Sequence, residues 1–239
     1  GALADVHPYV LLNHLDNYDS ASTLAHEMGH AMHSFFSNKY QPRETASYST
    51  FIAEIASILN ELLFAKHIIE KKDTEATEQI AVMDSVLEHL RTTFYRQTLF
   101  AEFELSMYEH VESGNILTDE WLCNKYHSLL TEYYGDVVVI DNLARYEWSI
   151  IPHMYYGFYV WNYATSFMAA TWIFNKLQTD PSFATTVVDK MLSAGGSKYP
   201  LDILKDIGLD MSSDKPITEA LKYYDKYIVE LSKKIKQKG

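Results

Sequence analysis

The stretch that most constrains this chain is His26-Glu27-Met28-Gly29-His30. Residues four apart lie about one turn apart on the same side of an α-helix, so both imidazole rings can reach one metal ion if this stretch is helical. Glu27 projects beside that face and can hold a water molecule on the metal without binding the metal itself. The pattern therefore predicts a helix that carries two metal ligands and a carboxylate base, the parts that a metal-assisted hydrolase needs.

The sequence around this stretch favours a helix. A polar cluster (Asp16, Asn17, Asp19, Ser20) precedes it and is suited to a turn and a helix N-cap. Within residues 23–36, apolar residues recur with helical spacing, and we expect them to form the apolar side of the helix: Leu24, Met28, Ala31 and Phe35. The alternative is a solvated helix with two incidental histidines.

A catalytic zinc ion with two histidine ligands needs a third protein ligand, which we expect from a neighbouring helix. Residues 44–71 read as a long helix because apolar residues recur at three and four: Phe51, Ile55, Ile58, Leu59, Leu62 and Leu63. Glu54 stands in the apolar part of this segment, where a carboxylate is costly to bury unless it is paired or metal-bound. We therefore rank Glu54 first. Glu61, two turns on, is either a carboxylate that supports the site or an ordinary structural or surface residue, and Glu44 is expected to cap the helix.

Several stretches together resemble one family. Two stretches closely resemble the thimet oligopeptidase/oligoendopeptidase F family of zinc metallopeptidases, above all its oligoendopeptidase F branch. They are His26–His30, continued by Ala31-Met32-His33, and Phe51-Ile52-Ala53-Glu54-Ile55-Ala56-Ser57. Three further stretches match in the same order along the chain: Pro8–Asn13, Ile151–Tyr159 and Gly195–Pro200. The resemblance implies that His26, His30 and Glu54 bind one zinc ion and that Glu27 is the catalytic base. His33 matches a further family histidine that is not a ligand.

The region after Pro152 is rich in hydrogen-bond donors. Tyr156, Tyr159 and Tyr163 have the spacing of one helical face, and a tyrosine stripe of this kind is more often core or groove lining than catalytic. The family, however, uses a histidine and one or more tyrosines from this region as donors to the scissile carbonyl and the oxyanion. The resemblance therefore assigns this role to His153 and to a tyrosine, with Tyr163 and Tyr156 preferred over Tyr159.

Two segments are expected to contact substrate. The first is a short strand near Tyr9–His14, in which the backbone of Val10, Leu11, Leu12 and Asn13 would pair with an extended peptide; an internal strand without substrate contact is the alternative. The second is Gly195-Gly196, which resembles a glycine-rich family loop near the cleft. A helix C-cap explains the first of these glycines equally well.

Composition excludes several classes of protein. The chain has 239 residues, of which 47% are hydrophobic and 22% charged, as expected of a globular protein. The formal net charge of −12 argues against a nucleic-acid partner. The sequence holds no apolar run of membrane-spanning length, and its single cysteine, Cys123, excludes an internal disulfide. Because residues 1–5 lack a basic stretch followed by an apolar one, we expect that they are not a signal peptide. Together with the resemblance, these features predict a cytoplasmic protein without a membrane partner.

Few glycines and prolines interrupt the chain, so we expect a mainly α fold: a multi-helical, zincin-like catalytic domain with a small β element near the N-terminus. Val137–Ile140 is a second strand candidate. The helices are expected at residues 74–112, 118–134, 157–177, 182–194 and 216–238. Since family members are usually much longer, the chain resembles the C-terminal catalytic part of a larger enzyme. We expect residues 1–239 to form one catalytic domain, with the N-terminal part of the parent enzyme absent.

The expected function is that of a zinc metalloendopeptidase that hydrolyses short peptides. A zinc carboxypeptidase or dipeptidase on the same core is one alternative, and an inactive zinc-binding helical fragment is another. A structural zinc site fits poorly because such sites prefer four ligands rich in cysteine. The same donors also accept Mn²⁺ or Co²⁺.

Overall fold

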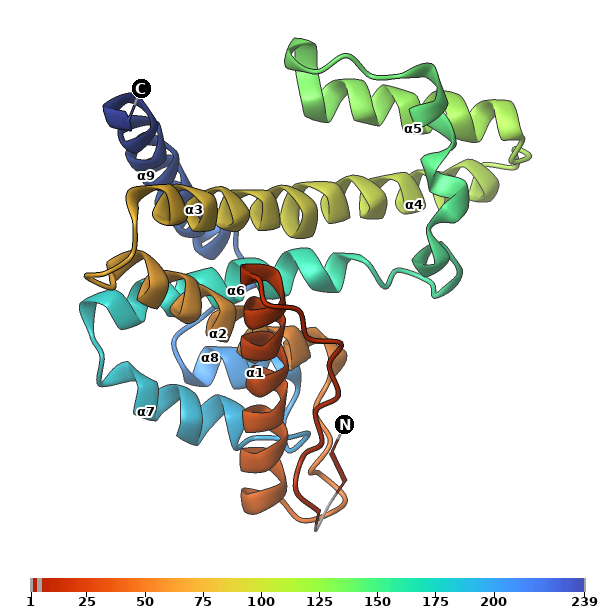
Figure 1. Ribbon diagram of the computed structural model, residues 1–239. Helices are drawn as coiled ribbons and strands as arrows, with labels where there is room; N and C mark the ends of the chain where they lie inside the picture. The colour runs from red at the N-terminus through yellow and green to blue at the C-terminus, as the bar shows by residue number, and fades with distance from the viewer. Residues whose placement is uncertain (1, 4–5, 239) are drawn as a thin grey trace. The chain divides into compact units, whose positions relative to one another are not determined.

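The computed structural model describes residues 2–3 and 6–238, and these residues form helices joined by turns (Figure 1). The mainly α prediction is therefore confirmed. The α-helices are α1 (Tyr18–Tyr40), α2 (Thr50–Glu70), α3 (Ala76–Leu90), α4 (Arg96–Glu112), α5 (Asp119–Tyr134), α6 (Trp161–Thr179), α7 (Phe183–Val187), α8 (Pro200–Asp206) and α9 (Lys215–Lys238). Two π-helical segments, Arg91–Tyr95 and Val188–Leu192, continue α3 into α4 and extend α7. Within the described part of the chain, no helix is both long and apolar enough to cross a membrane.

The chain divides into two compact units. Unit 1 comprises residues 1–89 and 165–239, and unit 2 comprises residues 90–164. The first unit thus holds α1, α2, α7, α8, α9 and nearly all of α3 and α6, whereas the second holds α4 and α5.

The core of unit 1 is built on α2, α6 and α9. Ile52 and Ile55 of α2 and Phe167 of α6 are fully buried, and Phe167 stacks on Tyr224 of α9 with ring centroids 5.8 Å apart. The hydroxyl of Tyr224 lies 3.1 Å from Oγ1 of Thr171, so the buried phenol has a hydrogen-bond partner. Burial of this apolar surface, at about 25 cal/mol per Å², fixes α2 as the scaffold beside which α1 packs.

The core of unit 2 is an aromatic and leucine cluster between α4 and α5. Phe103 of α4 and Tyr126 of α5 are both fully buried and meet edge to face with centroids 5.2 Å apart. The rest of the cluster consists of Leu99, Phe100, Leu129, Leu130 and Val160.

Both strand predictions are wrong. The described residues contain no strand, and Tyr9–His14 and Val137–Ile140 are irregular apart from a 3-10 turn that ends at Val137. The physical reason is that a strand needs a neighbouring strand to pair with. No backbone hydrogen bond joins Val10–Asn13 to another described residue. Val137 and Val139 are about nine-tenths exposed, so their β-branched character meets no sheet.

Local capping signals place some helix ends correctly. Asn17 caps α1, since its side chain accepts a hydrogen bond from the backbone N–H of Ser20 at 2.9 Å. Thr118 caps α5 in the same way, since its side chain accepts a hydrogen bond from the backbone N–H of Trp121.

Two of the expected helix starts are wrong. The second helix begins at Thr50 behind the N-cap Ser49, so Glu44 lies in a turn and caps nothing.

The expected start of a helix at Gly157 is also wrong. Gly157 and Phe158 both have positive φ, 56° and 52°, which is incompatible with a right-handed helix, and α6 begins only at Trp161.

The expected apolar side of α1 is not its buried side. Leu24, Met28 and Phe35 are between 41% and 49% exposed. The buried positions of α1 are Gly29, His33 and Ser37. At about 100° per residue these two sets lie on opposite sides of the helix. The packed face of α1 is therefore its polar and small-residue face, the face that carries the two histidines of the metal-binding pattern.

Candidate metal centre and groove

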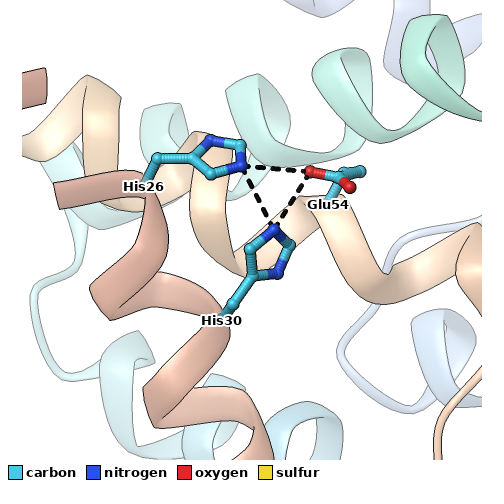
Figure 2. Close-up of side chains that lie close together, drawn as sticks. All are labelled: His26, His30 and Glu54. Carbon is cyan, nitrogen blue, oxygen red and sulfur yellow. Dashed lines mark hydrogen bonds and ion pairs between the residues drawn. The ribbon is translucent and has the colours of Figure 1, made fainter. Parts of the chain in front are cut away.

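Three predicted ligands come together between α1 and α2. His26 and His30 project from α1 and Glu54 projects from α2 toward them (Figure 2). The two Nε2 atoms are 3.1 Å apart, and each lies 3.4 Å from Oε2 of Glu54. Among the described residues, these three form a group whose ligand atoms could hold one metal ion.

The spacing of these atoms fits a zinc ion. Zinc bonds to histidine nitrogen and carboxylate oxygen at about 2.0–2.1 Å, so a tetrahedral site has ligand–ligand edges of about 3.3–3.4 Å. The three separations, 3.1, 3.4 and 3.4 Å, are close to these edges. Two nitrogens and one oxygen leave a fourth tetrahedral position open, as in catalytic rather than structural zinc sites.

Close packing of α1 on α2 makes this convergence possible. Gly29 lies between the two histidines in the sequence, and a Cβ atom there would sit 2.5 Å from the backbone O of Ala56 and from Cα of Ser57. Only glycine allows the two backbones to approach so closely. A hydrogen bond also joins the two helices: the side chain of Asn60 on α2 donates to the backbone O of Ala25 on α1 at 2.6 Å.

The electrostatics of the group favour charged Glu54. Burial alone would raise the pKa of its carboxyl, but the hydrogen bond and charge of His30 outweigh burial and lower that pKa, with further help from His26 and the Ser57 hydroxyl. For His26, burial alone would lower the pKa, but Glu61, with Glu54 and Glu27, outweighs it and raises that pKa. An ionised carboxylate between two imidazoles is a strong donor set for a divalent cation.

A groove of about 790 Å³ runs beside this group in unit 1. Glu27 and His30 line it together with Arg43 and Tyr48, and Pro8–Val10 form part of its wall. Asn38 of α1 donates a hydrogen bond to the backbone O of Leu3 at 3.0 Å, which holds the N-terminal segment beside the helix. Glu27 thus faces open space next to the candidate ligands, as a base acting on bound substrate must.

The segments predicted to contact substrate lie in different surroundings. Val10 lines the groove, and Leu11 is 97% exposed. Gly195 is buried against the loop that follows α1, where a Cβ would lie 2.2 Å from the backbone O of Thr45. The N–H of Gly196 donates to the same oxygen at 2.8 Å. Neither glycine is among the described residues that line the groove, so their visible role is close packing of two loops.

The predicted oxyanion donors form an aromatic cluster in unit 2. His153 packs against Tyr156, Tyr159 and Tyr163, with ring centroids 5.6–6.0 Å apart. The hydroxyl of Tyr163 is 3.5 Å from Nε2 of His153, at the outer limit of a hydrogen bond. Only Tyr163 belongs to α6, so the three tyrosines do not share the helical face that their spacing suggested. Their catalytic role stays a prediction.

The structure adds partners that the sequence did not reveal. Oε1 of Glu61 lies 3.2 Å from Nδ1 of His26, and its Oε2 lies 3.4 Å from Nδ1 of His89 on α3. The position of Glu61 two turns after Glu54 predicts either a carboxylate that supports the site or an ordinary structural residue. His89 carried no comparable signal, because it ends an ordinary amphipathic helix far from the pattern in sequence.

The chain belongs to peptidase family M3, whose family model matches residues 3–223. Its homologues are oligoendopeptidases F and related oligopeptidases. Oligopeptidase PepF of Bacillus subtilis (strain 168) is 39% identical over 96% of this chain and 35% of its own length.

Two crystal structures share the fold. A putative peptidase from Chlamydophila abortus superposes with a TM-score of 0.89 at 41% identity, covering 98% of this chain and 39% of its own. An oligoendopeptidase-F from Enterococcus faecium superposes with a TM-score of 0.80 at 35% identity, covering 92% of this chain and 40% of its own. The chain thus spans little more than a third of the length of the proteins it matches.

Proposed function

We propose that this chain is the catalytic part of a zinc metalloendopeptidase that hydrolyses short peptides. The observation that carries the proposal is the set of separations among the ligand atoms of His26, His30 and Glu54, 3.1–3.4 Å, next to a groove that Glu27 lines. Membership of peptidase family M3 supports it. The remainder of a longer peptidase, in addition to peptide substrates, is then the expected partner.

His26, His30 and Glu54 would hold the zinc ion. When bound, zinc supplies a Lewis acid that polarises the scissile carbonyl and favours ionisation of water. Glu27 accepts the proton of the attacking water and then delivers it to the leaving amine. Its place on α1 beside His30 supports this role, since both side chains line the same groove.

The groove would bind the peptide in an extended form. A volume of about 790 Å³ suits several residues of peptide. The backbone of Val10, Leu11, Leu12 and Asn13 pairs with no other described backbone group, so it offers hydrogen-bonding groups to a peptide. Gly195 and Gly196 would act from outside this groove, in a loop that adjusts around substrate.

His153 and a tyrosine would stabilise the developing oxyanion. Tyr163 is preferred because its hydroxyl lies 3.5 Å from Nε2 of His153, and Tyr156 follows. Removing one such donor typically costs about 2.7–4 kcal/mol of transition-state stabilisation.

A Glu27→Gln variant tests the proposal. The variant keeps the three ligands, so it should bind zinc like the wild type, but it should lose about 10²–10⁴-fold in kcat because the base is gone. Glu70→Gln, an exposed change on α2, is the matched control and should retain full turnover. Undiminished turnover by Glu27→Gln would remove Glu27 from its role.

Two other functions remain in competition, and one assay separates them. A peptide blocked at both ends is cleaved by an endopeptidase but not by a carboxypeptidase or dipeptidase. If the zinc-loaded chain cleaves no peptide at all, it is a zinc-binding helical fragment.

A further inference from the structure

A largely buried carboxylate contacts two other helices behind the candidate metal centre. Glu61 of α2 is only 13% exposed, and its two oxygens face different histidines: His26 of α1 at 3.2 Å and His89 of α3 at 3.4 Å. All three residues belong to unit 1. A charged group so deeply placed requires partners, and both partners here are imidazoles.

The contact with His26 decides which ring nitrogen carries the proton. Nδ1 of His26 lies 3.2 Å from Oε1 of Glu61, so this contact favours a proton on Nδ1, where the carboxylate can accept it. Nε2 is then left with a lone pair, and it is the atom that faces Glu54 and His30 (Figure 2). A carboxylate in this position also makes the imidazole a stronger donor to a metal.

The contact with His89 fixes the other side of the carboxylate. Oε2 of Glu61 has an ion-pair distance to Nδ1 of His89 but no hydrogen bond within the described residues. A cavity of about 20 Å³ adjoins it, lined by Tyr18, Ser22, Ser85 and His89 among others. A space of this size and polarity is large enough for one water molecule within reach of Oε2.

We propose that Glu61, held on its far side by His89, is the positioning residue that orients the ring of His26 for metal binding. The inference rests on the proposed metal site. Glu61 touches neither substrate nor metal in this arrangement; it acts through His26. His89 in turn acts through Glu61. Replacement of His89 should therefore also lower the zinc affinity, but by less than replacement of Glu61.

Zinc affinity of the 239-residue chain tests this proposal, measured by competition with a chromogenic chelator. Glu61→Ala should weaken zinc binding about 10–100-fold. Glu61→Gln should weaken it less, because the amide oxygen can still accept the Nδ1 proton. His89→Leu should weaken it by no more than about tenfold. Glu70→Ala, on the same helix but in an exposed pair with Lys66, is the matched control and should bind zinc normally.

A purely structural role predicts a different outcome. The free energy of unfolding of the same variants in EDTA separates the two roles, since positioning lowers zinc affinity by more than any loss of metal-free stability explains. Wild-type zinc affinity in Glu61→Ala, or a loss that matches its lost stability, would overturn the proposal while leaving the peptidase proposal intact.

Histidine ¹⁵N chemical shifts of the metal-free protein give a readout that needs no zinc. The ring of His26 should be protonated at Nδ1 in the wild type and should become a mixture of tautomers in Glu61→Ala. If the wild type failed to bind zinc, the peptidase proposal would fall, and an unchanged His26 tautomer in Glu61→Ala would still refute the positioning role by itself.

Discussion

Replacement of Gly29 by alanine should disrupt the candidate metal centre, because Gly29 lies in the contact between α1 and α2. The new Cβ would lie 2.5 Å from the backbone O of Ala56 and from Cα of Ser57. Both are backbone atoms of α2, so no side chain can rotate to make room. The helices themselves must separate, and the ligands they carry must separate with them.

The size of the movement follows from ordinary contact distances. A Cβ needs at least 3.4 Å to reach normal van der Waals contact, so the shortfall from 2.5 Å is about 0.9 Å. Metal sites tolerate errors of only about 0.2 Å in bond length. Since Glu54 is on α2 and both imidazoles are on α1, a shift of this size moves the carboxylate away from the nitrogens. We expect zinc affinity to fall at least about tenfold, or about 1.4 kcal/mol, and metal-free stability to fall by about 1–3 kcal/mol.

Chelator competition and urea unfolding in EDTA measure the two effects separately. Gly208→Ala serves as the matched control: Gly208 has φ of 86°, and a Cβ there would meet no atom within 4 Å. That variant should lose about 1–2 kcal/mol through backbone strain alone and keep its zinc affinity. Wild-type zinc affinity in Gly29→Ala would refute the claim that the close approach of α1 and α2 sets the ligand geometry.

Three further outcomes are expected. Burial lowers the pKa of His33 to about 3, so between that value and about 6.5 the unfolded chain binds a proton that the folded protein does not, and stability falls as the pH drops below 6.5. Relative to the wild type, His33→Phe should therefore gain about 1.3 kcal/mol of unfolding free energy between pH 7 and pH 5.5 in urea titrations, and parallel pH profiles would contradict this. Asn17→Ala should cost about 1 kcal/mol by removing the cap of α1, whereas Asn17→Asp should restore most of it in the same assay; equal stability of the two variants would count against the cap. Zinc at about 100 times its Kd should raise the free energy of unfolding by about 2.7 kcal/mol, and EDTA should abolish the gain. An unfolding free energy that zinc does not change would show that His26, His30 and Glu54 bind no metal.

The ligand group was within reach of the sequence because its geometry is mostly local. Two histidines at i and i+4 share a side of any helix, and the Asn17 cap makes a helix there secure. Glu54 required one tertiary assumption, that the two helices pack, and its apolar neighbours supported it. His89 required knowledge of where the end of α3 lies in space, which no periodicity supplies. The predictions of strands at Tyr9–His14 and Val137–Ile140 are wrong because the sequence does not show which segments are neighbours in space. Composition there favours a strand, but a strand forms only beside a partner strand.

The burial of α1 shows how a candidate metal site can override hydrophobic patterning. Periodicity correctly grouped Leu24, Met28 and Phe35 on one side of the helix, but it does not say which side meets the next helix. If that side packed on α2, large side chains would hold the axes apart and direct both histidines away from Glu54. The observed contact uses Gly29 instead, because only a small residue brings ligand atoms on two helices within 3.4 Å of each other. Sequence patterns predict a fold best where local and global demands agree, and they fail here at the residues that bring the three ligands together.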